Sequence, residues 1–392
     1  MNEKIFMLAY GRQLIDEDDI QEVIHALRGN MLTNGPYVEQ FEAKLCQVTD
    51  SPYTVACSNG TTALHLALIA LDIGPGDSVL VPAVTFLASA NAVRYVGADV
   101  VFVDIDPDTG LITPETLVAA IEQHPNHKFK AIINVHFAGQ CGDLEGIYAL
   151  AQKHGLRIIE DGAHAIGSSY FGADGSVHAV GKNRYSDITT FSFHPVKTIA
   201  MGEGGAITTQ CPDLSQRMRT LRTHGMVRDP KQFQQVAHGP WYYEMQELGY
   251  NYRVSDINCA LGLSQLRKLD AFIKARQHIV DYYDAAFTHM PHIQPMKQLS
   301  SSKTAWHLYV VSCDFNQIGR SQAECAKFLA TKGISVHVQY MPLYYHPYYQ
   351  KLYGDMRLPG AESYYKNSLC LPLYVGLSEQ DLDLVIESVG QL

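Results

Sequence analysis

Short apolar runs alternate with helical patterns through the first half of the chain. The runs are rich in β-branched residues and carry no polar face, which predicts strands that are buried on both sides of a sheet. They are YTVACS, SVLVPA, ADVVFVDID, KAIINVHF and LRIIED, and between them TTALHLALIAL, TFLASANAVRYV, TPETLVAAIEQH and LEGIYALAQKH predict helices. This alternation predicts an α/β fold with a large, doubly wound, mostly parallel sheet, in which ligands bind beyond the carboxyl ends of the strands.

Further elements are predicted on both sides of this region. Asp16 to Arg28, DEDDIQEVIHALR, form an amphipathic pattern with an acidic first turn, which predicts a helix, and a second helix is expected from near Tyr37. The runs YSDITTFSF and GGAITT predict two more strands, for which an antiparallel pairing is open, around a loop from Pro195 to Glu203.

The last third of the chain has a different pattern. Beyond Asp256, apolar residues recur at helical spacing for about thirty positions, which predicts one long or kinked helix. WHLYVVSCDF and ISVHVQYMPL then predict strands around a helical SQAECAKFLATKG, and a last helix is expected from Ser378. With 392 residues we expect two domains: residues 1–255 as the large α/β domain, and residues 256–392 as an interdomain helix with a smaller α+β domain.

The composition excludes several classes of protein. With 46% hydrophobic and 18% charged residues the chain is typical of globular proteins, and a net charge of −10 argues against a nucleic-acid partner. The eight cysteines lie far apart without a CxxC pair, so no metal site or disulfide scaffold is predicted. No apolar run approaches the length of a membrane span, and the amino-terminal residues lack a secretory apolar core. We therefore expect a cytoplasmic protein without a membrane partner.

Ser58 to Thr62 lie where a predicted strand runs into a helix. Backbone N–H groups at such a junction favour an anion, and Gly60 allows a phosphate to approach the backbone closely. Taken alone, the same residues are more often a simple helix cap without a ligand. The loop contains neither GxGxxG nor GxxxxGK, so a dinucleotide or a Walker site is not supported.

Glu160 and Asp161 end the predicted strand LRIIED, and His164 follows three residues later. A carboxylate in this place can pair with a protonated ring nitrogen, for which Asp161 is the stronger candidate. Ordinary helix capping is an equally good interpretation of an isolated ED pair. A lone histidine is more often structural than catalytic.

Lys197 lies in FSFHPVKTIAMGEGGAITT, among apolar and small residues. An arbitrary lysine is solvated, but one in a partly desolvated pocket has a lowered pKa and can form a Schiff base. A phosphate cup, a strand-end Asp161 and a loop lysine, in that order, are the parts that pyridoxal phosphate requires. Phe86 could stack on the ring of this cofactor, although a core phenylalanine is its commoner role.

The ordered motifs resemble those of the DegT-type sugar aminotransferases, which are pyridoxal-phosphate enzymes of the aspartate-aminotransferase fold (fold type I). The resemblance runs end to end through LTNGPYVEQFE, CSNGTTALHLAL, VPAVTF, EDGAHAIGSSY, FSFHPVKTIAMGEGGAITT, LGYNYRVSDINCALGLSQL, HLYVV and LPLY. It implies that Lys197 binds the cofactor covalently and acts as acid and base, and that Asp161 pairs with its ring nitrogen. It also implies that His164 contacts the phenolic oxygen and that Phe86 stacks on the ring.

The same resemblance assigns the phosphate contacts to Gly60, Thr61 and Ser192. Asn251, in GYNYRVSD, corresponds to a residue that reaches the phosphate of the neighbouring subunit. A homodimer with shared active sites is therefore implied. Some relatives carry histidine in place of the lysine and act as dehydratases, so Lys197 points to transamination.

Within the family the chain is most similar to the transaminases that form UDP-4-amino-4,6-dideoxy-N-acetyl-β-L-altrosamine in pseudaminic acid biosynthesis. The resemblance rests on PWYYEMQELGYNYR, ALGLSQLRKLD and VQYMPLYYHPYYQKLYG, and Gln339 departs from it where histidine is common. The implied substrates are L-glutamate and a UDP-linked 4-keto-6-deoxy-N-acetylhexosamine. Candidate substrate contacts are Tyr10, Thr33, His307 and Tyr344, with Arg222 and Arg228 as diphosphate ligands unless they only form a solvated face.

Three other functions stay open at this point. One is an aminotransferase for another nucleotide-linked keto sugar, of the 4-amino-4-deoxy-arabinose or dideoxyhexose type. The second is a sugar dehydratase or lyase with the same cofactor, which the presence of Lys197 disfavours. The third is a regulatory protein that binds a nucleotide sugar without turnover, and such a protein has no need of Asp161 together with Lys197.

Overall fold

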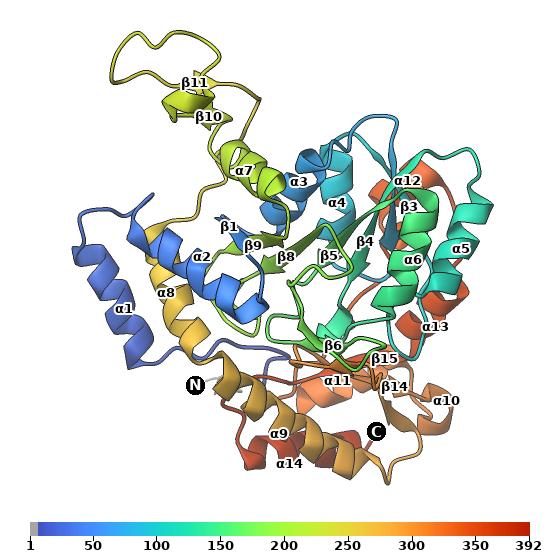
Figure 1. Ribbon diagram of the computed structural model, residues 1–392. Helices are drawn as coiled ribbons and strands as arrows, with labels where there is room; N and C mark the ends of the chain where they lie inside the picture. Colours follow the sequence, from blue (N-terminus) through green and yellow to red (C-terminus); the bar gives the residue numbers. More distant parts are fainter. Residues whose placement is uncertain (1–6) are drawn as a thin grey trace.

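A seven-stranded sheet forms the centre of the computed structural model, which describes residues 7–392 (Figure 1). Six strands run in one direction, and β9 is antiparallel to both of its neighbours. The order across the sheet is β1 (Tyr53–Cys57), β9 (Gly205–Thr209), β8 (Ile188–Ser192), β5 (Arg157–Asp161), β4 (Phe129–Val135), β2 (Ser78–Pro82) and β3 (Asp99–Val103). The predicted large, mostly parallel sheet is confirmed, and the open pairing of the last two strands is antiparallel.

The strands are buried as their apolar sequences require. Val79, Leu80 and Val81 of β2 have no exposed surface, because helices cover the sheet. The surrounding helices are α2 (Pro36–Thr49), α3 (Gly60–Ala70), α4 (Leu87–Tyr95), α5 (Pro114–Gln123), α6 (Leu144–His154) and α7 (Pro212–Leu221). All of them except α7, which the sequence pattern did not predict, begin within a few residues of their predicted positions.

The predicted long helix is two helices, α8 (Asp256–Arg267) and α9 (Leu269–Phe287), which meet at Lys268. Beyond them lies a small sheet of β12 (Ile293–Pro295), β14 (Tyr309–Cys313) and β15 (Ser368–Leu371), covered by α11 (Gln322–Thr331) and α14 (Glu379–Val389). The hydrophobic cluster of this smaller region includes Leu8 from the amino-terminal end. The division of the chain at residue 256 stays a prediction.

One predicted strand is wrong. The segment ISVHVQYMPL forms only two isolated bridges, between His337 and Cys370 and between Leu8 and Ile334. Its alternating apolar residues are typical of a strand, but the chain turns away from the small sheet toward a cavity that Gln339 and Tyr340 line. The Gln339 carbonyl accepts a hydrogen bond from Tyr364 instead of a strand neighbour.

An arm, residues 226–249, projects from the body above α7 (Figure 1). It carries a short hairpin of β10 (Met226–Val227) and β11 (Glu244–Met245), and its Trp241 and Leu248 are 75% and 73% exposed. The remaining elements are α1 (Glu17–Arg28), β6 (Ser169–Phe171), β7 (Val177–Ala179), β13 (Ser302–Lys303), α10 (Phe315–Ile318), α12 (Pro347–Tyr353), α13 (Pro359–Asn367) and short 3-10 turns at Phe137–Gly139, Pro230–Gln232 and Leu343–Tyr345.

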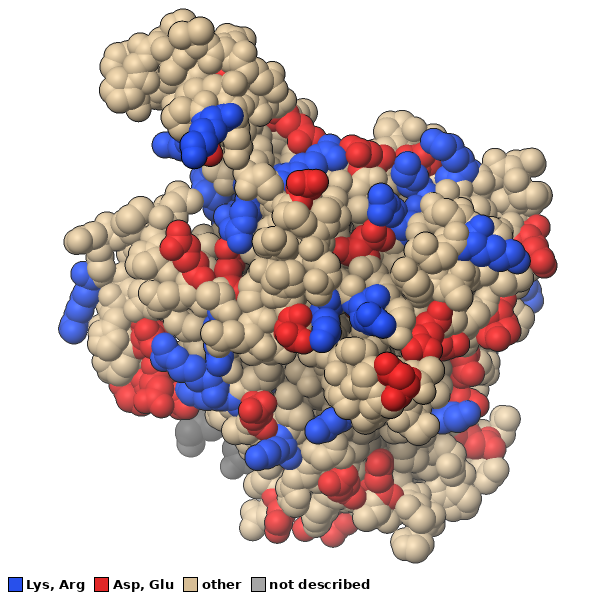
Figure 2. Space-filling model, viewed as in Figure 1, with Lys and Arg blue, Asp and Glu red and all other residues tan. Residues whose placement is uncertain are grey.

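Figure 2 shows acidic and basic side chains intermixed on one face of the molecule, with no continuous basic surface. Among residues 7–392, no helix is long and apolar enough to cross a bilayer. In the same range, no group of three or more His, Cys, Asp or Glu side chains is placed to hold a metal ion. The expected lack of a secretory leader concerns in part residues 1–6, which lie outside the described residues.

Candidate active site

A cavity of about 390 Å³ lies at the carboxyl ends of β4, β5 and β8. Its wall also includes the first turn of α3, the loop around Lys197 and the segment at Gln339 and Tyr340. Eight of the sequence-predicted residues line it, namely Tyr10, Gly60, Thr61, Phe86, Asp161, His164, Ser192 and Lys197. The structure therefore brings together the candidate lysine, carboxylate and phosphate cup at the expected edge of the sheet.

Lys197 is the cation of this cavity. Burial lowers the pKa of its amine to about 8, although the negative charge of Asp161 acts in the opposite direction. A substantial fraction of the amine is therefore neutral near pH 8, whereas an ordinary lysine is almost fully protonated there. The neutral amine is the nucleophile that attacks an aldehyde.

Asp161 is held by two donors. The Ser89 hydroxyl donates to Oδ2 at 2.8 Å, and the Ala163 backbone N–H donates to Oδ1 at 3.1 Å. Ser89 in turn lies 2.9 Å from the Thr85 hydroxyl, next to Phe86. These bonds fix the plane of a carboxylate that is only 6% exposed.

The sequence favoured Asp161 over Glu160 as the residue that faces the site. Successive side chains of a strand point to opposite faces. Asp161 lines the cavity, whereas Glu160 Oε2 lies 3.2 Å from His136 Nε2 on the other side of β5 and accepts a bond from Thr189. Glu160 is therefore a structural partner of the core, and Asp161 is the residue available to a ligand.

His164 and His307 form a neutral pair next to Lys197. Their ring centroids are 4.3 Å apart, and burial holds the pKa of both rings well below the usual value. The charge of Lys197 lowers both pKa values further. His307 lies behind His164 and does not line the cavity, so its expected contact with a sugar is not reproduced within this chain.

The loop after β1 supports both interpretations of Ser58 to Thr62. Asn59 caps α3 through a reciprocal pair of bonds with Thr62, as a simple helix cap would. The N–H groups of Gly60 and Thr61 in the first turn have no partner within the helix. A Cβ at Gly60 would lie 2.7 Å from Ser192 Cβ, so glycine lets the helix end and Ser192 share one surface of the cavity.

These residues fit pyridoxal phosphate. A helix N-terminus beside Ser192 suits a phosphate, an oriented carboxylate suits a ring nitrogen, and a desolvated amine suits an aldehyde. Phe86, 54% exposed at the cavity, offers a ring face for stacking. When bound, this cofactor supplies an electron sink for a carbanion.

Two of the remaining candidates, Arg222 and Tyr344, form hydrogen bonds outside the cavity. Arg222 donates to Glu42 Oε1 at 2.8 Å and to the Ala56 carbonyl at 2.6 Å, which joins α7 to α2 and β1. Tyr344 is 2% exposed, and its hydroxyl accepts a bond from the Leu358 N–H. Neither side chain lines the cavity of this chain, because each is already used in packing.

The last three candidates lie on or near the base of the arm. Thr33 forms an isolated β-bridge with Ser255, and Asn251 forms one with Thr223. The Arg228 guanidinium lies 5.6 Å from the ring centroid of Tyr243. None of Thr33, Asn251 and Arg228 lines the cavity of its own chain.

Sequence reasoning missed Ser89 and Tyr340. Tyr340 lines the cavity between Phe86 and His164, with its hydroxyl 3.4 Å from His164 Nε2. Burial raises the pKa of this phenol, which therefore stays protonated. Ser89 could have been found from its place one helical turn after Phe86, but Tyr340 lies in a segment that the pattern assigns to a strand.

Comparisons with known proteins agree with this geometry. The profile of the DegT/DnrJ/EryC1/StrS aminotransferase family matches residues 13–390. The spore coat polysaccharide biosynthesis protein SpsC of Bacillus subtilis is 39% identical over 388 residues, which cover 98% of this chain and 97% of SpsC. The chain is similar in structure to the pyridoxal-phosphate form of the putative sugar aminotransferase Spr1654 from Streptococcus pneumoniae, with 31% identity, a TM-score of 0.87 and coverage of 99% and 100%.

Helicobacter pylori PseC, an aminotransferase involved in the biosynthesis of pseudaminic acid, is a further structural relative. It is 28% identical, has a TM-score of 0.88 and is covered over 98% of both chains.

Proposed function

This chain belongs to the DegT/DnrJ/EryC1/StrS family and is a sugar aminotransferase that uses pyridoxal phosphate, and from that premise we propose its substrates. It transfers the amino group of L-glutamate to C4 of a UDP-linked 4-keto-6-deoxy-N-acetylhexosamine, and the product is UDP-4-amino-4,6-dideoxy-N-acetyl-β-L-altrosamine. The observation that carries transamination is the desolvated Lys197 amine in one cavity with the oriented Asp161. The likeness to PseC supports the choice of sugar.

The residues of the cavity divide the work. Lys197 would hold the cofactor through its amine. Once the amino donor has displaced that amine, the freed Nζ would take a proton from the carbon that carries the nitrogen and return it to the carbon on the other side of that nitrogen. Asp161 holds a proton on the ring nitrogen, while Gly60, Thr61 and Ser192 bind the phosphate. The neutral His164 and the aromatic Phe86 orient the ring. Burial of the Lys197 amine favours its neutral form, which is the form that accepts a proton.

We propose that the enzyme is a homodimer whose active sites are shared. The arm exposes Val236, Trp241 and Leu248, which are between 73% and 83% exposed in a single chain, and such side chains favour a protein partner. Asn251 lies at the base of the arm and Arg228 lies on the arm. In such a dimer both side chains can contribute to the cavity of the second copy. Lys197 is the one lysine or arginine that lines the described cavity, so a partner arginine supplies charge for a diphosphate.

A cytoplasmic location is part of the same proposal. All eight cysteines are free thiols in the described chain. Six of them are buried, as thiols of a reducing compartment commonly are.

The test is an assay of 2-oxoglutarate release from L-glutamate. The purified enzyme receives UDP-2-acetamido-2,6-dideoxy-β-L-arabino-hexos-4-ulose, its D-xylo epimer or a UDP-linked 4-keto pentose in separate reactions. Selective turnover of the L-arabino sugar supports the proposal. Turnover of one of the other sugars keeps the reaction and replaces the substrate.

A different keto sugar is the second candidate, and the comparisons give a reason for it. SpsC, which is named for spore coat polysaccharide, is 39% identical to this chain, whereas PseC is 28% identical. A dehydratase or a binding protein would instead show no 2-oxoglutarate release with any sugar despite bound cofactor.

A further inference from the structure

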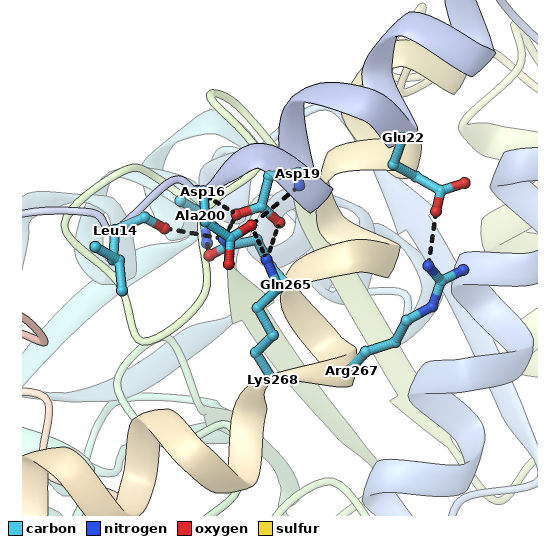
Figure 3. A network of polar contacts seen from close by, with 8 residues as sticks. All are labelled: Leu14, Asp16, Asp19, Glu22, Ala200, Gln265, Arg267 and Lys268. Atoms are coloured by element: carbon cyan, nitrogen blue, oxygen red, sulfur yellow. Dashed lines mark hydrogen bonds and ion pairs between the residues drawn. The ribbon is translucent and has the colours of Figure 1, made fainter.

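The backbone that follows Lys197 is fastened from behind by helix α8. Gln265 in α8 is 1% exposed, and its Oε1 accepts a bond from the Ala200 N–H at 3.3 Å. Its Nε2 donates to Asp19 Oδ2 at 2.7 Å and to the Leu14 carbonyl at 3.0 Å. Figure 3 shows this amide between the three partners, so both of its polar atoms are engaged.

Two of these partners belong to a segment that also reaches the cavity. We call residues 8–19 the amino-terminal strap. Leu8 is bonded to Gly333 and Ser335 of the smaller region, at 2.8 Å and 2.9 Å, and Tyr10 lines the cavity. The strap then passes to Leu14 and Asp19. Gln265 is therefore the point where the strap, α8 and the lysine loop meet.

A second amide on α8 holds the loop one residue further on, at Met201. Asn258 Nδ2 donates to the Met201 carbonyl at 2.6 Å. Asn258 and Gln265 are seven residues apart, which places them on one face of the helix. The Met201 N–H is bonded to the Phe193 carbonyl at 2.9 Å. Both polar backbone groups of Met201, its carbonyl and its N–H, are therefore hydrogen-bonded.

We propose that Gln265 is a positioning residue for Lys197: through the Ala200 peptide it fastens the lysine loop to α8 and the amino-terminal strap, and so holds the amine in the cavity. Gln265 does not line the cavity. It contacts the lysine loop at the Ala200 N–H, and Ala200 is three residues after Lys197 in the chain. This inference rests on the proposed role of Lys197. A displacement of a reacting group by about 1 Å can cost about a hundredfold in rate.

A purely structural role for the amide has a different signature. The ion pairs of Lys268 with Asp16 and with Asp19, the latter at 3.0 Å, also anchor the strap to α8. They lie near Gln265 (Figure 3), and both join Lys268 to the strap residues Asp16 and Asp19 and not to Ala200. Lys268→Met therefore loosens the strap and leaves the Ala200 bond in place, which makes it the matched control for Gln265→Met.

The experiment compares Gln265→Met with Lys268→Met and the unaltered enzyme in three measurements. Hydrogen exchange of the Ala200 amide and the pH dependence of trace acetylation of Lys197 are measured on cofactor-free protein. The third measurement gives kcat and the KM for the sugar. For Gln265→Met we expect the Ala200 amide to exchange about tenfold faster. The pH midpoint of Lys197 acetylation should rise toward that of an ordinary lysine. We expect kcat to fall about tenfold with little change in the KM for the sugar. Lys268→Met should leave all three near the unaltered values.

A second variant covers the case in which Gln265→Met does not fold. Gln265→Glu keeps an oxygen for the Ala200 N–H. Its second oxygen lies against the buried Asp19 carboxylate, so the two carboxyl groups must share a proton. Loop exchange should therefore stay closer to that of the unaltered enzyme than to that of the methionine variant. The inference is overturned if Gln265→Met lowers only thermal stability, as we expect for Lys268→Met. In that case the Ala200 exchange rate and kcat would stay within about twofold of the unaltered enzyme, and the pH midpoint of Lys197 acetylation would not move. If Lys197→Ala retained turnover, the role of Lys197 would fail, while the exchange measurement would still report whether Gln265 holds the loop.

Discussion

The two walls of the cavity are built in different ways. The sheet wall, with Asp161, Ser192 and Gly60, consists of strand ends and a helix start and carries the Lys197 loop. The opposite wall, with Tyr10, Gln339 and Tyr340, comes from segments without regular structure and carries no formal charge. We propose from this difference that the sheet wall determines which reaction occurs, and that the opposite wall helps to determine which sugar is accepted. Variants of the two walls should therefore change different kinetic constants.

Lys197→Ala should have the largest effect. The change removes the amine to which we assign cofactor binding and proton transfer in the proposed reaction, so we expect a loss of turnover of about a thousandfold or more, with the fold retained. Turnover and the visible absorbance of the cofactor measure the effect. Lys182→Ala, which removes a surface lysine paired with Asp50, is the control and should change neither. Substantial activity in Lys197→Ala would show that another group does the work.

Asp161→Asn should come next. The amide has the same shape, but it cannot balance a positive charge on a ring nitrogen, so we expect kcat to fall about a hundredfold and the cofactor to dissociate more easily. Asp143→Asn, which alters an exposed cap of α6, is the control. Equal activity of Asp161→Asn and the unaltered enzyme would contradict the pairing of Asp161 with the ring.

Ser89→Ala sharpens the same point with a smaller effect. The variant removes the donor to Asp161 Oδ2 but leaves the charge and the bond from Ala163. We expect kcat to fall about tenfold, because the carboxylate can turn away from its productive orientation. Ser89→Thr, which keeps a hydroxyl, should restore part of the rate. If Ser89→Ala kept the rate of the unaltered enzyme, the hydroxyl would not be what orients Asp161.

The contrast between the walls also explains what the sequence could reveal. Lys197 and Asp161 were predictable, because each follows a strand whose apolar pattern is plain and because ligands bind at strand ends. Gln265 was not, because Ala200, its partner in the lysine loop, lies 65 residues away and only the folded chain brings the two together. Ser89 lies one helical turn after Phe86, which points to the site, but its bond to Asp161, 72 residues away, could not be predicted. Tyr340 was assigned to a strand, since apolar alternation does not show that a segment leaves its sheet. Arg222 lacked any local sign that Glu42 would pair with it.

The pKa of Lys197 predicts a pH dependence of cofactor binding. Below a pKa of about 8 the amine is mostly protonated and does not attack an aldehyde, so the rate at which cofactor-free enzyme binds pyridoxal phosphate should rise with pH. From pH 7 to pH 8 the neutral fraction rises about fivefold, and the rate should level off above pH 9. The pKa values of His164 and His307 lie well below 6.5, so neither ring titrates in this range. A rate that still climbs tenfold per unit above pH 9 would indicate an ordinary lysine.

Tyr340→Phe tests the opposite wall and should have the smallest effect. The variant keeps the ring beside Phe86 and removes a hydroxyl that lies 3.4 Å from His164 Nε2. A bond this long contributes little, so we expect the KM for the sugar to rise about threefold and kcat to stay within about twofold. Tyr344→Phe removes a hydroxyl outside the cavity and should leave the KM unchanged. A hundredfold loss of kcat in Tyr340→Phe would place part of the chemistry on the irregular wall, and the division of labour between the two walls would not hold.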